Sequence, residues 1–368
     1  MKLKLKKKNC FIALIIVLIL ILEILNPFKL YSVFKIKKLN YSTSSASLII
    51  KYGLKEKVLN NSYNEFIDKY IFAKDFNVSN YTVYNELNYY KNVSISQVNE
   101  LIVKGYNSKE INCILMTGNY DSISSLLKKD KYENIDKFLC YEYANLSNLD
   151  RYIAYQQKTL SNYDESVLNV EIGLDKTYYD DSKVVSTFSY DMLVNKYFKL
   201  EANFIPDDLV KVKDEYSVDS EYGNATMLNS FYQMADDLNK ELDLKIYVRS
   251  GYRSYKDQEE IYNTYYKLYG QKYVNNYVAR AGFSEHQTGL ALDIKASSSK
   301  TFDGTKESEW LKKNAYKYGF IHRYTKANES ITGYKFESWH YRYVGIEIAK
   351  VVYDKNITYE EYCVKYGK

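Results

Sequence analysis

Apolar residues recur at helical or strand spacing in the last third of the chain. Met227, Phe231, Met234 and Leu238 stand four, three and four residues apart, which predicts an amphipathic helix over 224–241. The same periodicities predict strands at 244–248, 290–294 and 339–344, and helices over 255–268 and 309–318. Segments of both kinds predict an α+β fold with a small antiparallel sheet flanked by helices.

Residues 40–165 carry short apolar patterns of helical type and predict a mostly helical region. Two pairs of segments are alike at an offset of 68 residues: 67–71 with 135–139, and 77–80 with 145–148. Two copies of a small helical unit would produce such matches. A composition rich in Lys, Asn and Tyr would also produce them, so both explanations stay open.

Between residues 165 and 220 the pattern changes to short alternating segments. Leu168, Val170 and Ile172 alternate with polar residues, which predicts a strand. Pro206 then interrupts the chain before a second short apolar segment at 209–212. We therefore expect strands and turns in this part.

The N-terminus begins with five lysines in eight residues, followed by an apolar run from Cys10 to Leu25 that only Glu23 interrupts. Sixteen helical residues span about 24 Å, against roughly 30 Å for the hydrocarbon core of a bilayer. The basic flank predicts a cytoplasmic tail over 1–8 and a transmembrane signal anchor over 9–27. This implies a single-pass cell-membrane protein with the rest of the chain outside the cytoplasm. The alternative is a cleaved signal peptide, although no small-x-small site closes the run.

Composition excludes several classes of protein. Only 2 Pro and 14 Gly rule out collagen-like and glycine-rich chains, and a formal net charge of +5 over 368 residues predicts no nucleic-acid partner. Four Cys are too few for a disulfide scaffold. Cys113 and Cys140 either pair or remain buried thiols. The 43 Tyr are explained best by a general composition bias.

Arginine and histidine are rare and confined to one part of the chain. Of the basic residues 45 are Lys and 6 are Arg, and five of these Arg lie between 249 and 342 with all three His and both Trp. Residues 1–222 contain no His. In a chain so rich in Lys, an Arg marks a place that needs a planar, forked cation. If the protein has catalytic or metal-binding residues, we therefore expect them in the last third of the chain.

Two short segments there combine residue types that bind metals. His286 precedes Asp293 by seven residues in an apolar run, and Glu337 precedes His340 by three. Three ligands with one open position form a hydrolytic zinc site, and a nearby unligated carboxylate suits a general base. Taken singly, each residue also fits a structural role, and His322 is interpreted as structural. Ser297 and Lys300 match a serine-enzyme motif, but they lie in a polar loop pattern without its partners.

The combined pattern resembles a known family. It is similar to the zinc D-Ala-D-Ala carboxypeptidases of the VanY type, in the fold group of lysostaphin-type peptidases and Hedgehog domains. The matching residues are Ser284-x-His286-x-x-Gly289-x-Ala291-x-Asp293, followed by Glu337-x-Trp339-His340. The likeness covers about residues 190–368, and it continues in the segments 250–258, 319–324 and 342–345. The chain departs from the family pattern at Ser338, where the family usually has Pro, and at His322, where it has an aliphatic residue.

The resemblance implies a role for each matched residue. His286, Asp293 and His340 would bind Zn²⁺, and Glu337 would be the catalytic base. Arg253 would stabilise the oxyanion or hold substrate, and Gln258 and Ser284 would bind the substrate backbone and its carboxylate. The implied enzyme trims the C-terminal D-Ala of peptidoglycan stem peptides at the outer face of the membrane. Residues 40–165 lie outside the resemblance, and we expect them to space or position the catalytic domain or to bind a partner.

Three alternatives share the same zinc ligands. An L,D-carboxypeptidase would act on tetrapeptides, and an endopeptidase would cut within the stem. A wall-binding relative would keep the metal without turnover, although it would have no reason to keep Glu337.

Overall fold

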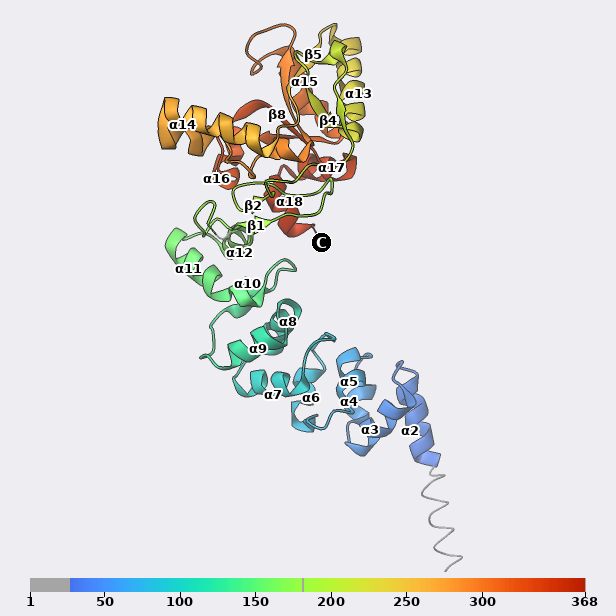
Figure 1. Cartoon of the computed structure of the whole chain (residues 1–368). Coiled ribbons are helices and arrows are strands. Elements are labelled where there is room, and N and C mark those ends of the chain that lie inside the picture. Colours follow the sequence, from blue (N-terminus) through green and yellow to red (C-terminus); the bar gives the residue numbers. More distant parts are fainter. Residues whose placement is uncertain (1–26, 181, 368) are drawn as a thin grey trace, which may run out of the picture. The chain divides into compact units, whose positions relative to one another are not determined.

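The computed structural model describes residues 27–180 and 182–367 (Figure 1). The chain divides into two compact units, Met1–Ile153 and Ala154–Lys368. Each unit is described below by itself.

The first unit is built from short helices. Their bounds are α2 (Pro27–Lys37), α3 (Thr43–Lys51), α4 (Lys55–Leu59), α5 (Glu65–Tyr70), α6 (Tyr81–Tyr84), α7 (Ile95–Val103), α8 (Ser108–Thr117), α9 (Tyr120–Leu127), α10 (Ile135–Leu139) and α11 (Leu149–Thr159), which continues into the second unit. For several of these helices, an Asn or Ser side chain just before the helix accepts a hydrogen bond from its first turn. Examples are Asn64 before α5 and Asn107 before α8. Such caps satisfy free backbone N–H groups and favour many short helices.

The segments that match at an offset of 68 also share local structure. Asn77 and Asn145 each begin a 3₁₀ turn, η1 (Val78–Asn80) and η2 (Leu146–Asn148). The backbone N–H of Asn77 donates to Tyr84 Oη at 3.4 Å, and that of Asn145 donates to Tyr152 Oη at 2.8 Å. The two segments are therefore alike in sequence and in hydrogen bonding.

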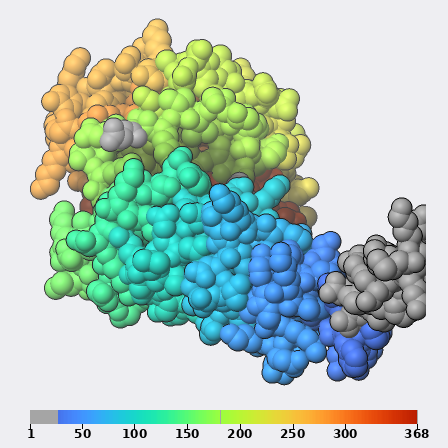
Figure 2. Space-filling view, turned by 90° about the horizontal axis from the view of Figure 1, so that it is seen from below, coloured from blue at the N-terminus to red at the C-terminus, as the bar shows by residue number. Residues whose placement is uncertain are grey.

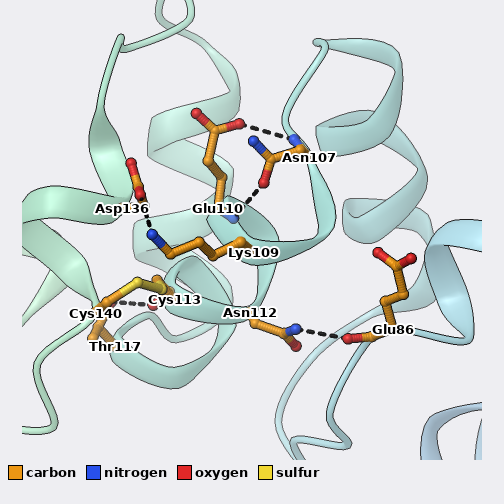
Figure 3. Close-up of a disulfide and its surroundings, with 9 residues drawn as sticks. All are labelled: Glu86, Asn107, Lys109, Glu110, Asn112, Cys113, Thr117, Asp136 and Cys140. Carbon is orange, nitrogen blue, oxygen red and sulfur yellow. Dashed lines mark hydrogen bonds and ion pairs between the residues drawn. A yellow bond between two sulfur atoms is a disulfide. The ribbon is translucent and has the colours of Figure 1, made fainter.

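A disulfide joins two helices of this unit. Cys113 in α8 is bonded to Cys140, the residue after α10, and Lys109 pairs with Asp136 across the same two helices at 2.7 Å (Figure 3). Of the two alternatives left open for these cysteines, the structure has the paired one. Cys363 is a free, half-buried thiol.

Loss of this disulfide will destabilise the first unit. The bond closes a loop with a sequence separation of 27, so replacing both Cys113 and Cys140 by Ser will lower the free energy of unfolding by about 3–4 kcal/mol, mainly through the unfolded state. Urea unfolding with and without reductant measures the difference. The double variant should not respond to reductant. The matched control is Cys363→Ser, which keeps the disulfide and should lose stability on reduction as the wild type does. An unchanged midpoint in the double variant would contradict this prediction.

The second unit carries the sheet and longer helices. Its elements are α12 (Tyr163–Ile172), β1 (Lys183–Val184), β2 (Phe198–Lys199), β3 (Leu209–Lys211), β4 (Tyr222–Asn224), α13 (Ala225–Leu242), β5 (Ile246–Ser250), α14 (Tyr255–Tyr277), β6 (Ala291–Ala296), α15 (Lys306–Asn314), β7 (Phe320–Tyr324), α16 (Glu329–Thr332), β8 (Glu337–Tyr343), α17 (Ile346–Lys355) and α18 (Tyr359–Lys365). Strands β5, β6, β8 and β7 form, in that order, an antiparallel sheet. The α+β part of the fold prediction therefore describes this unit.

The sheet separates the core from a polar face. Met227, Phe231 and Leu238 of α13 pack in one buried cluster with Leu292 and Ile294 of β6. Because side chains alternate along a strand, Asp293 points to the opposite face. The register pairs Asp293 with His340 of β8. Pairing of β6 with β8 thus brings two of the predicted metal ligands together.

The strand predicted at residues 168–172 is wrong. These residues lie in α12, where the Asn162 side chain accepts from the N–H of Glu165 at 2.8 Å. Gly173, with φ 104°, ends the helix. Val167, Leu168, Val170 and Ile172 are all buried, and at 3.6 residues per turn these four positions spread over more than half of the helix circumference. A short apolar run of this kind does not distinguish a buried helix from a strand.

The predicted transmembrane helix, and the single-pass membrane localisation built on it, are wrong for the part of the chain that is described. Within residues 27–180 and 182–367 no helix is long and apolar enough to cross a bilayer. Helix α2, which follows the predicted anchor, has 11 residues with Lys29, Lys35 and Lys37 among them, and it spans about 16 Å. The predicted tail over 1–8 and all of the predicted anchor before Pro27 lie outside the described residues.

Candidate active site

Two buried histidines and a partly buried aspartate converge on the polar face of the sheet. His286 lies in the 3₁₀ turn η4 (Glu285–Thr288) before β6, Asp293 in β6 and His340 in β8. One ligand atom from each lies within 4.8 Å of the other two. Asp293 Oδ1 is 3.4 Å from His286 Nε2 and 3.1 Å from His340 Nδ1. Gly289, with φ 70°, turns the chain between η4 and β6.

The second nitrogen of each imidazole ring has its own partner. His286 Nδ1 is 2.7 Å from the carbonyl oxygen of Gly251, so Nδ1 donates and Nε2 presents a lone pair. His340 Nε2 is 3.0 Å from Glu285 Oε2, which leaves Nδ1 to face Asp293. Two nitrogen lone pairs and a carboxylate oxygen then meet in a buried space. This donor set fits zinc, and the outer hydrogen bonds fix the ligand orientations.

Glu337 lies next to this donor set without being part of it. Its Oε2 is 3.8 Å from His340 Nδ1, at the start of β8. Burial raises the pKa of the Glu337 carboxyl to about 8, against the opposing effect of His340. His322 hydrogen-bonds through Nε2 to the backbone oxygen of Glu337 at 2.9 Å, and burial lowers its pKa to about 4. His322 is therefore neutral and supports the strand that carries Glu337.

Arg253 is held as a fixed cation at the same site. Its Nη1 donates to Gln258 Oε1 at 2.8 Å, and its Nη2 donates to Ser250 Oγ at 2.9 Å. Gln258 in turn donates to the backbone oxygen of Ala279 at 2.7 Å. Gln258 is thus anchored on both sides and orients the guanidinium.

All the predicted site residues line one cavity, which we call the active-site pocket. Its volume is about 420 Å³. The seven predicted residues on its wall are Arg253, Gln258, Ser284, His286, Asp293, Glu337 and His340.

A buried ion network behind His340 was missed by the sequence analysis. Glu285 Oε1 accepts from Arg323 Nε at 2.8 Å, and Arg342 Nη1 lies 3.4 Å from the same oxygen. Arg323 also pairs with Glu360 of α18 at 2.6 Å. Burial alone would raise the pKa of Glu285, but the two arginines and His340 hold it well below its usual range. The scarcity of Arg was the available signal, because an Arg in a Lys-rich chain marks a place that needs a planar, forked cation.

Comparison with known proteins gives a consistent family match. A family model described as VanY, D-alanyl-D-alanine carboxypeptidase, matches residues 220–346. YodJ of Bacillus subtilis, named as a carboxypeptidase, is 38% identical over 216 residues, which cover 54% of this chain and 79% of that protein. The Enterococcus gallinarum protein VanXYC, named as a bifunctional D-Ala-D-Ala dipeptidase and carboxypeptidase, is 30% identical over 46% of this chain and 91% of its own length.

Solved structures with similar sequences carry related names. The LdcB LD-carboxypeptidase is 38% identical and covers 51% of this chain and 92% of its own, with a TM-score of 0.46. VanYB in complex with D-alanine-D-alanine is 32% identical, and the match covers 48% of this chain and 98% of that chain, with a TM-score of 0.43. At these scores the structural likeness adds nothing to the family match. The relatives found by sequence and the cluster of His286, Asp293 and His340 both indicate the same kind of enzyme. The chain is a zinc metallopeptidase and belongs to the VanY family of D-alanyl-D-alanine carboxypeptidases.

Proposed function

We propose that this protein removes the C-terminal D-Ala from peptidoglycan stem pentapeptides. The observation that carries the proposal is the convergence of His286, Asp293 and His340 in one pocket with Glu337 beside them. His286 Nε2, His340 Nδ1 and Asp293 would hold the zinc ion. When bound, zinc polarises the scissile carbonyl and lowers the pKa of water toward about 7.

Glu337 moves the proton in this mechanism. The raised pKa of about 8 belongs to the site without a metal ion, and the charge of a bound Zn²⁺ would favour the carboxylate form of Glu337. That carboxylate takes a proton from the attacking water and gives it to the nitrogen of the leaving D-Ala. The Oε2 of Glu337 is 3.8 Å from His340 Nδ1, and the side chain is 15% exposed, so the group adjoins the metal donors with little access to bulk water. A base in this position is shielded from competing proton exchange.

Arg253 binds the developing negative charge. A guanidinium has five N–H donors in a fixed plane, and two of its hydrogen bonds, to Gln258 and Ser250, set that plane. The remaining donors are available to the carbonyl oxygen of the scissile bond or to the terminal carboxylate of the substrate. Ser284, which is buried in the same pocket, supplies a hydroxyl for the substrate backbone.

The test is incubation of the full chain with synthetic penta-, tetra- and tripeptide stems, read by mass spectrometry. Loss of one Ala from the pentapeptide alone supports D,D specificity. Loss from the tetrapeptide alone would identify an L,D-carboxypeptidase, and internal cleavage would identify an endopeptidase. Zinc binding without any cleavage would overturn the enzymatic proposal.

The buried network behind His340 gives a separate prediction. Replacing Glu285 by Gln will weaken zinc binding about 10–100-fold, because His340 loses the charged partner of its outer nitrogen. The change will also destabilise the fold by about 3–5 kcal/mol, since Arg323 and Arg342 lose a buried counter-charge. Competition with a chelating dye measures the first effect, and urea unfolding measures the second.

The matched control for this variant is Glu307→Gln. Glu307 is fully buried and accepts hydrogen bonds from Ser298, but it does not line the active-site pocket. Its replacement should lower stability and leave zinc affinity unchanged. If both variants keep wild-type zinc affinity, Glu285 does not orient His340.

A further inference from the structure

Helix α14 carries a group of contacting tyrosine rings beside the active-site pocket. Of its seven tyrosines, four form what we call the tyrosine cluster: Tyr265, Tyr269, Tyr273 and Tyr277. Ring centroids are 5.8 Å apart for Tyr265 and Tyr269, 4.6 Å for Tyr269 and Tyr273, and 4.8 Å for Tyr273 and Tyr277. The helix projects from the rest of its unit, and its orange atoms stand out in the space-filling view (Figures 1 and 2).

A break at Gly270 brings the rings of the cluster together. In a straight helix, residues 265 and 273 would lie about 12 Å apart along the axis. The ring centroids of Tyr265 and Tyr273 are instead 6.1 Å apart, with planes 5° from parallel. Gly270 has φ 78° and ψ 175°, and an added Cβ would meet nothing within 4 Å. The glycine is therefore needed for its backbone conformation, which other residues rarely adopt.

The cluster continues the wall of the active-site pocket outward. Tyr265, Tyr273 and Tyr277 line the pocket together with Glu337 and the metal donors. Tyr269 lies outside that lining and is 59% exposed. The pocket volume of about 420 Å³ is near the lower end of about 300–1,000 Å³ for small-ligand sites. A stem peptide that is joined to sugars exceeds this volume, so part of it must lie outside.

We propose that the tyrosine cluster binds the glycan part of peptidoglycan while the pocket holds the C-terminus of the stem peptide. This inference rests on the proposed function. A pyranose ring offers an apolar C–H face and a rim of hydroxyls, and a tyrosine offers an apolar ring with a polar tip. The four side chains carry no charge, which suits a neutral partner.

The size of the cluster argues for a narrow ligand. A stable protein–protein interface buries about 800 Å² on each partner, with roughly 20–30 residues a side. The cluster is four rings wide, of which Tyr265, Tyr269 and Tyr277 are exposed and Tyr273 is half-buried. One or two sugar rings stacked on these tyrosines would cover a surface of this size.

The test compares kcat/KM for a free pentapeptide with kcat/KM for the same pentapeptide joined to the N-acetylglucosamine–N-acetylmuramic acid disaccharide. We expect the wild-type full chain to prefer the disaccharide form roughly five- to tenfold, the effect of one stacked ring. In Tyr269→Ala this preference should fall toward one. The matched control is Tyr266→Ala, which removes a tyrosine that is 46% exposed on the same helix, lies outside the pocket lining and stacks on Tyr262. It should keep the preference.

A second measurement separates this inference from the proposed function. Isothermal titration calorimetry with a peptide-free glycan oligosaccharide should show binding by the wild type and weaker binding by Tyr269→Ala, even if neither peptide is cleaved. Equal kcat/KM on both substrates in the wild type, or no glycan binding, would overturn the inference about the tyrosine cluster. The proposed function would still stand if the wild type released D-Ala. An equal loss on both substrates in Tyr269→Ala would assign the cluster to the stem peptide and also overturn it.

Discussion

Replacement of Glu337 by Gln will reduce kcat for D-Ala release by about 10³-fold, within the range that a general acid–base contributes. The amide has nearly the shape of the carboxylate, but it cannot accept a proton from water or return one to the leaving amine. The Oε2 of Glu337 is 3.8 Å from His340 Nδ1, and Glu337 lies outside the three-residue donor set. Zinc content should therefore stay at one per chain. Steady-state kinetics and atomic emission measure the two quantities.

Two results would contradict this prediction for Glu337. A variant that keeps more than a tenth of wild-type kcat would mean that another group moves the proton. A variant that loses zinc would mean that Glu337 is a ligand. The control is Glu329→Gln, which changes a carboxylate that pairs with Lys335 at 2.6 Å outside the pocket lining. It should keep full activity.

Much of the second unit could be predicted from local pattern alone. The spacing of Met227, Phe231 and Leu238 predicted the buried face of a helix, and in α13 these residues pack against the sheet. Asp293 was expected on a strand, and the register of β6 and β8 places it opposite His340. Patterns of this kind work where one face of an element is buried and the other is polar.

The remaining features depend on contacts that are distant in sequence. Glu285 contacts Arg323, 38 residues away, and Arg323 contacts Glu360, 37 residues further. No local pattern specifies such a chain of contacts. The prediction of a strand at 168–172 failed for another reason. The buried residues of α12 spread over more than half of the helix circumference, so the helical period does not show in the sequence. The tyrosines of α14 were assigned to composition bias, because the break at Gly270 that groups them is a matter of backbone conformation.

Removal of one metal ligand will weaken zinc binding more than removal of a residue that only hydrogen-bonds to a ligand. Asp293→Ala takes away the charged member of the donor set and leaves two imidazoles. We expect zinc affinity to fall by more than the roughly 100-fold that loss of an outer-shell partner costs. D-Ala release should fall below detection at micromolar zinc. Equilibrium dialysis against a zinc buffer measures the affinity.

Chelation and thermal unfolding test the same site in the unmodified chain. Dialysis of the wild type against a chelator should abolish activity, and added zinc should restore it. Zinc at 100 times its Kd should stabilise the wild type by about 2.7 kcal/mol and raise its Tm, because it binds only the folded state. Asp293→Ala should show neither recovery nor a shift in Tm. The control is Asp303→Ala, an exposed carboxylate 3.6 Å from Lys312, which should respond to zinc as the wild type does. Zinc bound at wild-type affinity in Asp293→Ala would place the metal elsewhere and remove the basis of the mechanism.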